Sequence, residues 1–102
     1  MYRPIRCTTL QEVRDQIDRV DTLIVGLIAE RTGYVVQAAR FKDTKEAVRI
    51  PTRIEFIIDR VRVLAQETGL DPAMIESVYR QLIEQSIERE SRYWDEINHS
   101  SE

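Results

Sequence analysis

The strongest pattern in the sequence is a helical repeat of apolar residues along its first half. The repeat has alternating spacings of three and four residues and comprises Leu10, Val13, Ile17, Val20, Ile24, Leu27, Arg31, Tyr34, Ala38 and Phe41. Thr9 followed by Glu12 fits a capping box, because each side chain can satisfy a backbone donor near the other. No proline interrupts the pattern before Lys42. We therefore predict a first helix of about 33 residues, which is about 50 Å long.

Two further helices are predicted after a polar loop over residues 43–50. Pro51 suits the first turn of a second helix, and Gly69 suits the left-handed position that ends it. Asp71 and Pro72 fit the N-cap and first residue of a third helix. The second stripe comprises Ile54, Ile57, Ile58, Val61, Leu64 and Ala65. The third comprises Ile75, Val78, Tyr79, Leu82, Ile83, Ser86, Ile87, Glu90, Tyr93 or Trp94, and Ile97.

The helix pattern predicts an all-α fold in which the chain has a partner. No strand pattern competes, and we interpret residues 1–102 as a single helical domain with a very long first helix. A helix of about 50 Å is longer than a globule of about 100 residues is wide. One short chain cannot cover the whole stripe of that helix, so a homodimer is the default expectation.

Composition narrows the classes of function. The chain has 15 basic and 18 acidic residues and a net charge of −3, without a basic cluster, so no nucleic-acid partner is expected. The longest apolar stretch, residues 23–29, is about a third of a bilayer span, and no export signal is recognised. We therefore expect a cytoplasmic protein without a membrane partner. A lone Cys7 and the lack of His or Cys clusters give no support for a metal site or a nucleophilic triad.

The informative residues are polar side chains that interrupt the apolar stripes. Arg31 lies on the first stripe, and Lys42, eleven residues later, returns to within about 20° of the same direction on a continuous helix. Ser86 and Glu90, four residues apart, interrupt the third stripe, and Arg53 lies in a first helical turn, where a cation opposes the macrodipole. Because burying unpaired charge is costly, these groups indicate a polar pocket for a charged ligand.

Each of these residues also has a purely structural explanation, and these alternatives stay open at the sequence level. The stem of Arg31 could cover apolar surface at a dimer interface. Lys42 could complement the dipole at a helix C-terminus. Ser86 could donate to the carbonyl four residues back, and Glu90 could form a rim ion pair with Arg53 or Arg89.

From about Thr8 to Trp94 the sequence resembles the all-α class of chorismate mutases, which are intertwined homodimers of three-helix chains without cofactor. The resemblance rests on two motifs, Arg14-x-x-Ile17-Asp18-x-x-Asp21 and Arg31-x-x-Tyr34-Val35-x-x-Ala38-x-Arg40-Phe41-Lys42. Residues 34–42, the turn at 69–71 and the Tyr93-Trp94 pair are especially similar to the related isochorismate pyruvate lyases.

The resemblance implies roles for the four cations. Arg14 and Arg31 are expected to hold the two carboxylates of the substrate. Lys42 is expected to reach the enol-ether oxygen and one carboxylate, and Arg53 is similar to a loop-side arginine of the mutases. Arg14 lies 17 residues before Arg31, about 25 Å along one helix, which is too far for both to hold one small molecule. We therefore expect an antiparallel partner chain to supply Arg14.

The remaining expected site residues come from the third helix and the end of the first. Ser86 is similar to a serine that helps to hold a carboxylate. Glu90 falls where the mutases place Gln or Glu against the ether oxygen, and we expect it to act as a neutral acid. The expected catalytic residues are Lys42 and Glu90. The expected substrate-binding residues are Arg14, Arg31, Arg53, Ser86, Val35 and Ile87.

The residues around Arg53 and Glu90 point to two related substrates. The mutases carry acidic groups three residues before and one residue after the loop-side arginine, where this chain has Ile50 and Ile54. Their loss favours the lyase, whereas Ser86 with Glu90 favours the mutase. Our main prediction is rearrangement of chorismate to prephenate. Elimination of pyruvate from isochorismate to give salicylate is the alternative, and a non-catalytic helical dimer is a more distant one. The expected ligand is a small dianion.

Overall fold

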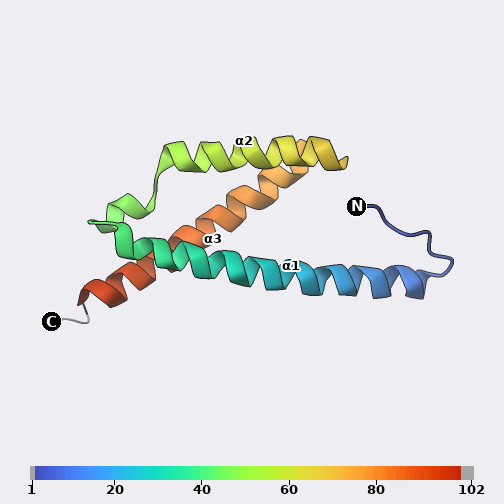
Figure 1. Cartoon of the computed structure of the whole chain (residues 1–102), viewed down its shortest axis with the longest axis horizontal. Helices are drawn as coiled ribbons and strands as arrows, with labels where there is room; N and C mark the ends of the chain where they lie inside the picture. Colours follow the sequence, from blue (N-terminus) through green and yellow to red (C-terminus); the bar gives the residue numbers. More distant parts are fainter. Residues whose placement is uncertain (1, 100–102) are drawn as a thin grey trace. The chain divides into compact units, whose positions relative to one another are not determined.

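The computed structural model describes residues 2–99, which form three α-helices and two short 3₁₀ turns without any strand (Figure 1). In chain order these elements are α1 (Leu10–Ala38), η1 (Ala39–Phe41), η2 (Lys45–Val48), α2 (Pro51–Thr68) and α3 (Pro72–His99). The predicted all-helical class and the long first helix are confirmed. None of the helices within residues 2–99 combines the length and apolar character needed to cross a bilayer.

The cap at the start of α1 follows the sequence prediction with one shift. The Thr9 hydroxyl accepts a hydrogen bond from the Glu12 backbone N–H at 3.1 Å. The Glu12 carboxylate reaches back to the backbone N–H of Thr8, at 2.8 Å, one residue earlier than a standard capping box. These hydrogen bonds, with the Thr8 backbone contributing most, lower the pKa of Glu12 from its ordinary value.

The turn between α2 and α3 confirms the predicted end of the second helix and the predicted start of the third. Gly69 adopts φ 77°, the left-handed conformation that side chains with a Cβ disfavour, and Leu70 donates its N–H to the Ala65 carbonyl at 2.8 Å. The Asp71 carboxylate then accepts the Ala73 N–H at 3.0 Å and so caps α3.

The predicted end of the first helix, at about Lys42, is wrong. The helix has 29 residues and stops at Ala38, and η1 follows. Lys42 is already extended, with φ −105° and ψ 129°. A 3₁₀ turn has 3.0 residues per turn, so the helical phase that placed Lys42 on the same face as Arg31 does not apply. Contacts from α3, described below, hold Lys42 in this extended conformation, whereas the periodicity predicted that the helix continues to Lys42.

Residues 43–50 are also more ordered than the predicted polar loop. They contain η2, which the Thr44 hydroxyl caps by accepting the Ala47 N–H at 3.3 Å. Val48 within η2 is buried. The sequence pattern missed this element because a turn of four residues is too short to show a repeat.

The chain divides into two compact units, one up to Gly33 and the other from Tyr34 onward. In the second unit, α2 and α3 run in opposite directions from the turn that joins them, as Figure 1 shows, and α3 also packs against η1 and η2. The buried apolar residues all belong to this unit and are Ala39, Val48, Ile58, Val61, Ala65 and Ile83. They form the core that positions the candidate site.

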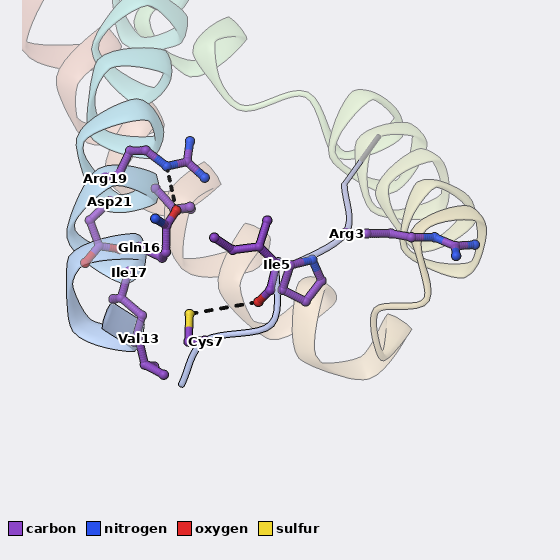
Figure 2. A pocket seen from close by; sticks show the side chains of 10 residues that line it. Arg3, Ile5, Cys7, Val13, Gln16, Ile17, Arg19 and Asp21 are labelled. Carbon is purple, nitrogen blue, oxygen red and sulfur yellow. Dashed lines mark hydrogen bonds between the residues drawn. The ribbon is translucent and has the colours of Figure 1, made fainter. Parts of the chain in front are cut away.

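The first unit exposes its apolar residues. No residue of α1 is buried. The N-terminal arm lies beside α1 and forms with it a pocket of about 460 Å³ (Figure 2). The walls of this pocket are mainly apolar and include Ile5, Cys7, Val13, Ile17 and Val20. None of the site residues predicted from the sequence lines it.

Candidate active site

The structure brings together the two residues predicted to be catalytic. The Lys42 Nζ lies 3.0 Å from Oε2 of Glu90, although the two residues are 48 positions apart. Their side chains are 18% and 6% exposed. This is the geometry of an ammonium that donates to a carboxylate in a partly water-excluded place. The partner of Glu90 is thus Lys42, and the alternative of a rim ion pair with a neighbouring arginine is wrong.

Two elements position this pair. Glu90 is buried on the face of α3 that packs against η1, and Lys42 is the residue at which the chain leaves η1. Trp94, one turn after Glu90, donates its indole N–H to the Lys42 carbonyl at 3.0 Å. Sequence reasoning gave Trp94 only as an alternative to Tyr93 for a stripe position and missed this contact. Its spacing of four from Glu90 was the available signal, because residues four apart share a helix face.

Ser86 and Ile87 continue the same side of α3. Ser86 is buried one turn before Glu90, and its hydroxyl donates to the Leu82 carbonyl at 2.8 Å. The structural alternative for Ser86, donation to the carbonyl four residues back, is therefore realised. Ile87 is half-buried, as is Val35 near the end of α1.

Arg53 lies in the first turn of α2 and is exposed. Its guanidinium lies over the ring of Phe56, 5.1 Å from the ring centre. This cation–π contact orients the side chain on the helix surface. Ile50 and Ile54, the residues that stand in place of acidic groups, flank the start of the same helix, and Ile54 is half-buried. The substrate-binding role of Arg53 stays a prediction.

Arg14 and Arg31 belong to the unit that ends at Gly33. Arg14 is exposed and Arg31 is half-buried, both on α1. Their separation of 17 residues corresponds to about 25 Å on this continuous helix. Their expected contacts with substrate carboxylates also stay predictions.

Two ion pairs fasten the segment after Lys42 to α3. Arg49 makes two hydrogen bonds to the Glu84 carboxylate, at 2.9 and 2.6 Å, and Lys45 contacts Asp95 at 2.6 Å. The hydrogen bonds from Arg49 lower the pKa of Glu84 and raise that of Arg49. The partners are 35 and 50 residues apart, so no local sequence pattern could predict them.

The site can stabilise negative charge without a titrating nucleophile. Its central group is an ammonium, and an ammonium has three N–H donors, of which the contact with Glu90 uses one. Within residues 2–99, His, Cys, Asp and Glu form no group of three or more that could hold a metal ion. A cation held in place beside a carboxylate is suited to polarising an oxygen atom of a bound anion.

Comparison with known proteins identifies the family of this chain. Residues 13–91 match the family of chorismate mutase type II, and the chain belongs to that family. It is 35% identical over 94 residues to the isochorismate pyruvate lyase of Pseudomonas aeruginosa, covering 92% of this chain and 93% of that protein. It is 30% identical over 93 residues to the chorismate mutase of Methanocaldococcus jannaschii, covering 90% and 94%. The chain is therefore an enzyme of the isomerase type rather than a non-catalytic module.

Proposed function

We propose that this enzyme rearranges chorismate to prephenate. The observation that carries the proposal is the ion pair of Lys42 and Glu90, formed by the two predicted catalytic residues in a place little exposed to water. Membership of the chorismate mutase type II family supplies the substrate class, a small dianion. The reaction breaks an ether C–O bond while a new C–C bond forms, so it needs a folded substrate and stabilised charge rather than a covalent intermediate.

Lys42 has the main electrostatic role in this proposal. Negative charge develops on the ether oxygen as the C–O bond breaks, and an ammonium N–H aimed at that oxygen becomes more stabilising in the transition state than in the ground state. Since Glu90 uses one of the three donors of Nζ, the ammonium keeps two for the substrate. Lys42 thus contacts the ether oxygen and one carboxylate.

Glu90 has two candidate roles in the same step. As a neutral acid it donates a hydrogen bond to the ether oxygen, as the family resemblance implies. As a carboxylate it holds the Lys42 ammonium, which is the contact present in the substrate-free chain. An ionised Glu90 facing the ether oxygen opposes the charge that forms there, so we assign it the neutral role once substrate is bound.

The other predicted residues bind the substrate. Arg31 and Arg14 hold the two carboxylates, and Arg53 adds a cation at the start of α2. The Ser86 hydroxyl helps to hold a carboxylate after its proton rotates away from the Leu82 carbonyl, which it contacts in the free chain. Val35 and Ile87 line the apolar side of the substrate; both are half-buried, which leaves part of each side chain available for contact.

A homodimer completes this site. The apolar stripe of α1 is exposed along its length, for example 53% at Ile17 and 65% at Leu27, and a soluble chain rarely leaves so long an apolar surface uncovered. With 29 residues, α1 is about 44 Å long, and an antiparallel partner helix covers the stripe and brings its own Arg14 to the site. Each site then draws residues from both chains.

Elimination of pyruvate from isochorismate is the second candidate. It is favoured by Ile50 and Ile54, which stand where the mutases carry acidic groups. The similarity over 92% of this chain to a protein named as an isochorismate pyruvate lyase also favours it. Both reactions break the same kind of C–O bond, so the pair of Lys42 and Glu90 serves either.

The test is incubation with chorismate and isochorismate separately, followed by chromatographic identification of prephenate, salicylate and pyruvate. We expect prephenate from chorismate, and Lys42→Ala should lower kcat about 10²-fold, the scale of removing one preorganised donor. Lys45→Ala is the matched control, because its exposed ion pair with Asp95 is worth at most a few-fold in rate. Salicylate as the main product assigns the second candidate, and no product from either substrate overturns the proposal.

A further inference from the structure

Each polar group of Lys42 has at least one hydrogen-bond partner. Its backbone N–H donates to the Ala39 carbonyl at 3.2 Å, which closes η1. Its ammonium donates to Glu90 at 3.0 Å, and its carbonyl accepts the indole N–H of Trp94, also at 3.0 Å. Two of these three contacts come from one face of α3, because Glu90 and Trp94 lie one helical turn apart.

The carbonyl contact answers a local structural need. With ψ at 129°, Lys42 turns out of η1, so its carbonyl has no helical N–H to accept. A partly buried carbonyl without a partner is costly, and Trp94, half-buried itself, supplies a donor at this point. The indole N–H is a donor only and is fixed to a rigid ring, so it defines one direction for the carbonyl.

We propose that Trp94 is a positioning residue that fixes the backbone of Lys42 and thereby aims its ammonium at the reacting ether oxygen. This inference rests on the proposed function for its kinetic consequence, but the contact itself is independent of the substrate. The carbonyl of Lys42 and its side chain share one Cα. Holding the carbonyl therefore limits the directions from which the four-carbon stem starts. In the substrate-free chain Glu90 holds the other end of the stem, so α3 contacts Lys42 at both its backbone and its ammonium.

Trp94→Phe separates the hydrogen bond from the packing, because it keeps an aromatic ring and removes the donor. We expect kcat to fall about 5-fold, the effect of one neutral hydrogen bond, with KM changed less than about 2-fold. Tyr93→Phe is the matched control, since it removes the polar atom of the neighbouring half-buried aromatic residue, and its kcat should stay within about 2-fold of wild type.

The same substitution in a Lys42→Ala background tests whether Trp94 acts through Lys42. A positioning role predicts no further loss of kcat in that background, because the group being positioned is absent. An equal loss in both backgrounds overturns the inference, since Trp94 then acts independently of Lys42. Unchanged kcat in the wild-type background overturns it as well.

Hydrogen exchange keeps the inference testable without catalysis. Trp94 is the chain's one tryptophan, so its indole N–H gives a single nuclear magnetic resonance signal. In the wild-type protein this proton should exchange at least about 10-fold more slowly than in a free indole, because it is hydrogen-bonded. Trp94→Phe should speed amide exchange in residues 42–49 and leave α2 unchanged. A fast indole proton overturns the inference even if the variant fails to fold. If the wild type turns over neither substrate, the proposed function is wrong. The exchange measurements then still decide whether Trp94 holds the carbonyl of Lys42.

Discussion

The apolar stripes of α1 and α3 look alike in the sequence, yet they have opposite environments in the folded chain. Along α3, the stripe residues Ile83, Ser86 and Glu90 are buried. Along α1, no residue is buried. The neighbours of α3 are α2, η1 and η2 of the same chain. The comparison teaches that a 3.6-residue repeat predicts a helix and its apolar side, but not which chain covers that side.

The two stripes also differ in where polar groups are placed. Two of the three buried residues of α3 are polar, and a buried carboxylate is tolerated only when it is paired. Glu90 meets this condition through Lys42. The self-covered stripe of α3 therefore holds Glu90, the buried partner of Lys42, while α1, whose stripe is exposed, carries Arg14 and Arg31, which are proposed to bind carboxylates. The following predictions test this division, beginning with the largest effect.

Ile24→Asp should disrupt the dimer interface that we propose for the exposed stripe of α1. Ile24 is 47% exposed within one chain, so the substitution is mild if α1 stays uncovered. Buried against a partner helix, however, an unpaired carboxylate is strongly destabilising. We expect loss of the dimer and of more than about 99% of activity, since a change of roughly 3 kcal/mol is already more than a factor of 100.

Sedimentation or light scattering of wild type and variant measures this effect. Thr22→Asp is the matched control, because it adds the same charge to α1 on the opposite face, two residues or about 200° away. It should keep the dimer. A wild-type protein that is monomeric at micromolar concentration contradicts the prediction, whatever the variant does.

Mixing two inactive variants should restore activity if a site takes Arg14 from one chain and Lys42 from the other. Arg14→Ala and Lys42→Ala homodimers each lack one group in both sites. A random mixture contains about half heterodimers, each with one complete site, so about a quarter of wild-type activity should return. The measurement is turnover after prolonged subunit exchange. Mixing Arg14→Ala with Arg31→Ala tests whether those two arginines also come from different chains. No recovery from the first mixture, with exchange verified by mass, would mean that the two groups are not shared between chains as proposed.

How far the sequence predicted this molecule depends on whether the determining contacts are local. The end of α2 and the start of α3 were predicted correctly from Gly69 and Asp71, because the conformational preferences of these residues act within a few positions. The last turn of α1 was predicted wrongly, since Lys42 is held out of the helix by Glu90 and Trp94, 48 and 52 positions away. Local periodicity contains no information about such contacts.

The candidate site shows the same limit of sequence-based prediction, because its contacts join residues that are distant in the chain. Glu90 was selected as a polar interruption of an apolar stripe and Lys42 by its helical phase relative to Arg31, and the family resemblance placed both at the ether oxygen. The structure pairs them directly. This direct contact was not predicted, because periodicity does not relate the end of one helix to a turn of another. Trp94 escaped notice for a different reason. Its apolar ring fitted the stripe, so the pattern gave no sign that its N–H would have a separate partner.

Glu90→Gln should separate the two roles proposed for Glu90 on the self-covered stripe. The amide donates a hydrogen bond at every pH, whereas a carboxyl group donates only while protonated. We expect the variant to keep kcat within about 3-fold of wild type, because its amide supplies the donor proposed for the neutral acid. The measurement is kcat with the better substrate. Glu88→Gln, which changes an exposed carboxylate on the same helix, should also follow wild type.

The outcome for Glu90→Gln separates its two candidate roles. A variant whose kcat stays near wild type means that a neutral donor at this position is sufficient. A variant that loses most of its activity means that the carboxylate is required, as expected if its function is to hold the ammonium of Lys42.

The smallest expected effect concerns the ion pair that joins η2 to α3. The hydrogen bonds from Arg49 lower the pKa of Glu84 below its ordinary value of 4.5. A carboxyl group whose pKa is lower in the folded state stabilises the fold above its unfolded pKa, and that contribution is lost as pH falls through the folded value. Glu84→Gln should therefore be slightly less stable than wild type at pH 7, and the difference should shrink below the ordinary value of 4.5 and close in stronger acid. Urea unfolding midpoints across this pH range measure it. Glu88→Gln is again the control, because the ion pair of Glu88 with Arg92 lies within α3, so its unfolding curve should track wild type more closely. Curves for wild type and Glu84→Gln that stay parallel from neutral to acid would mean that the contact between η2 and α3 does not depend on this charge.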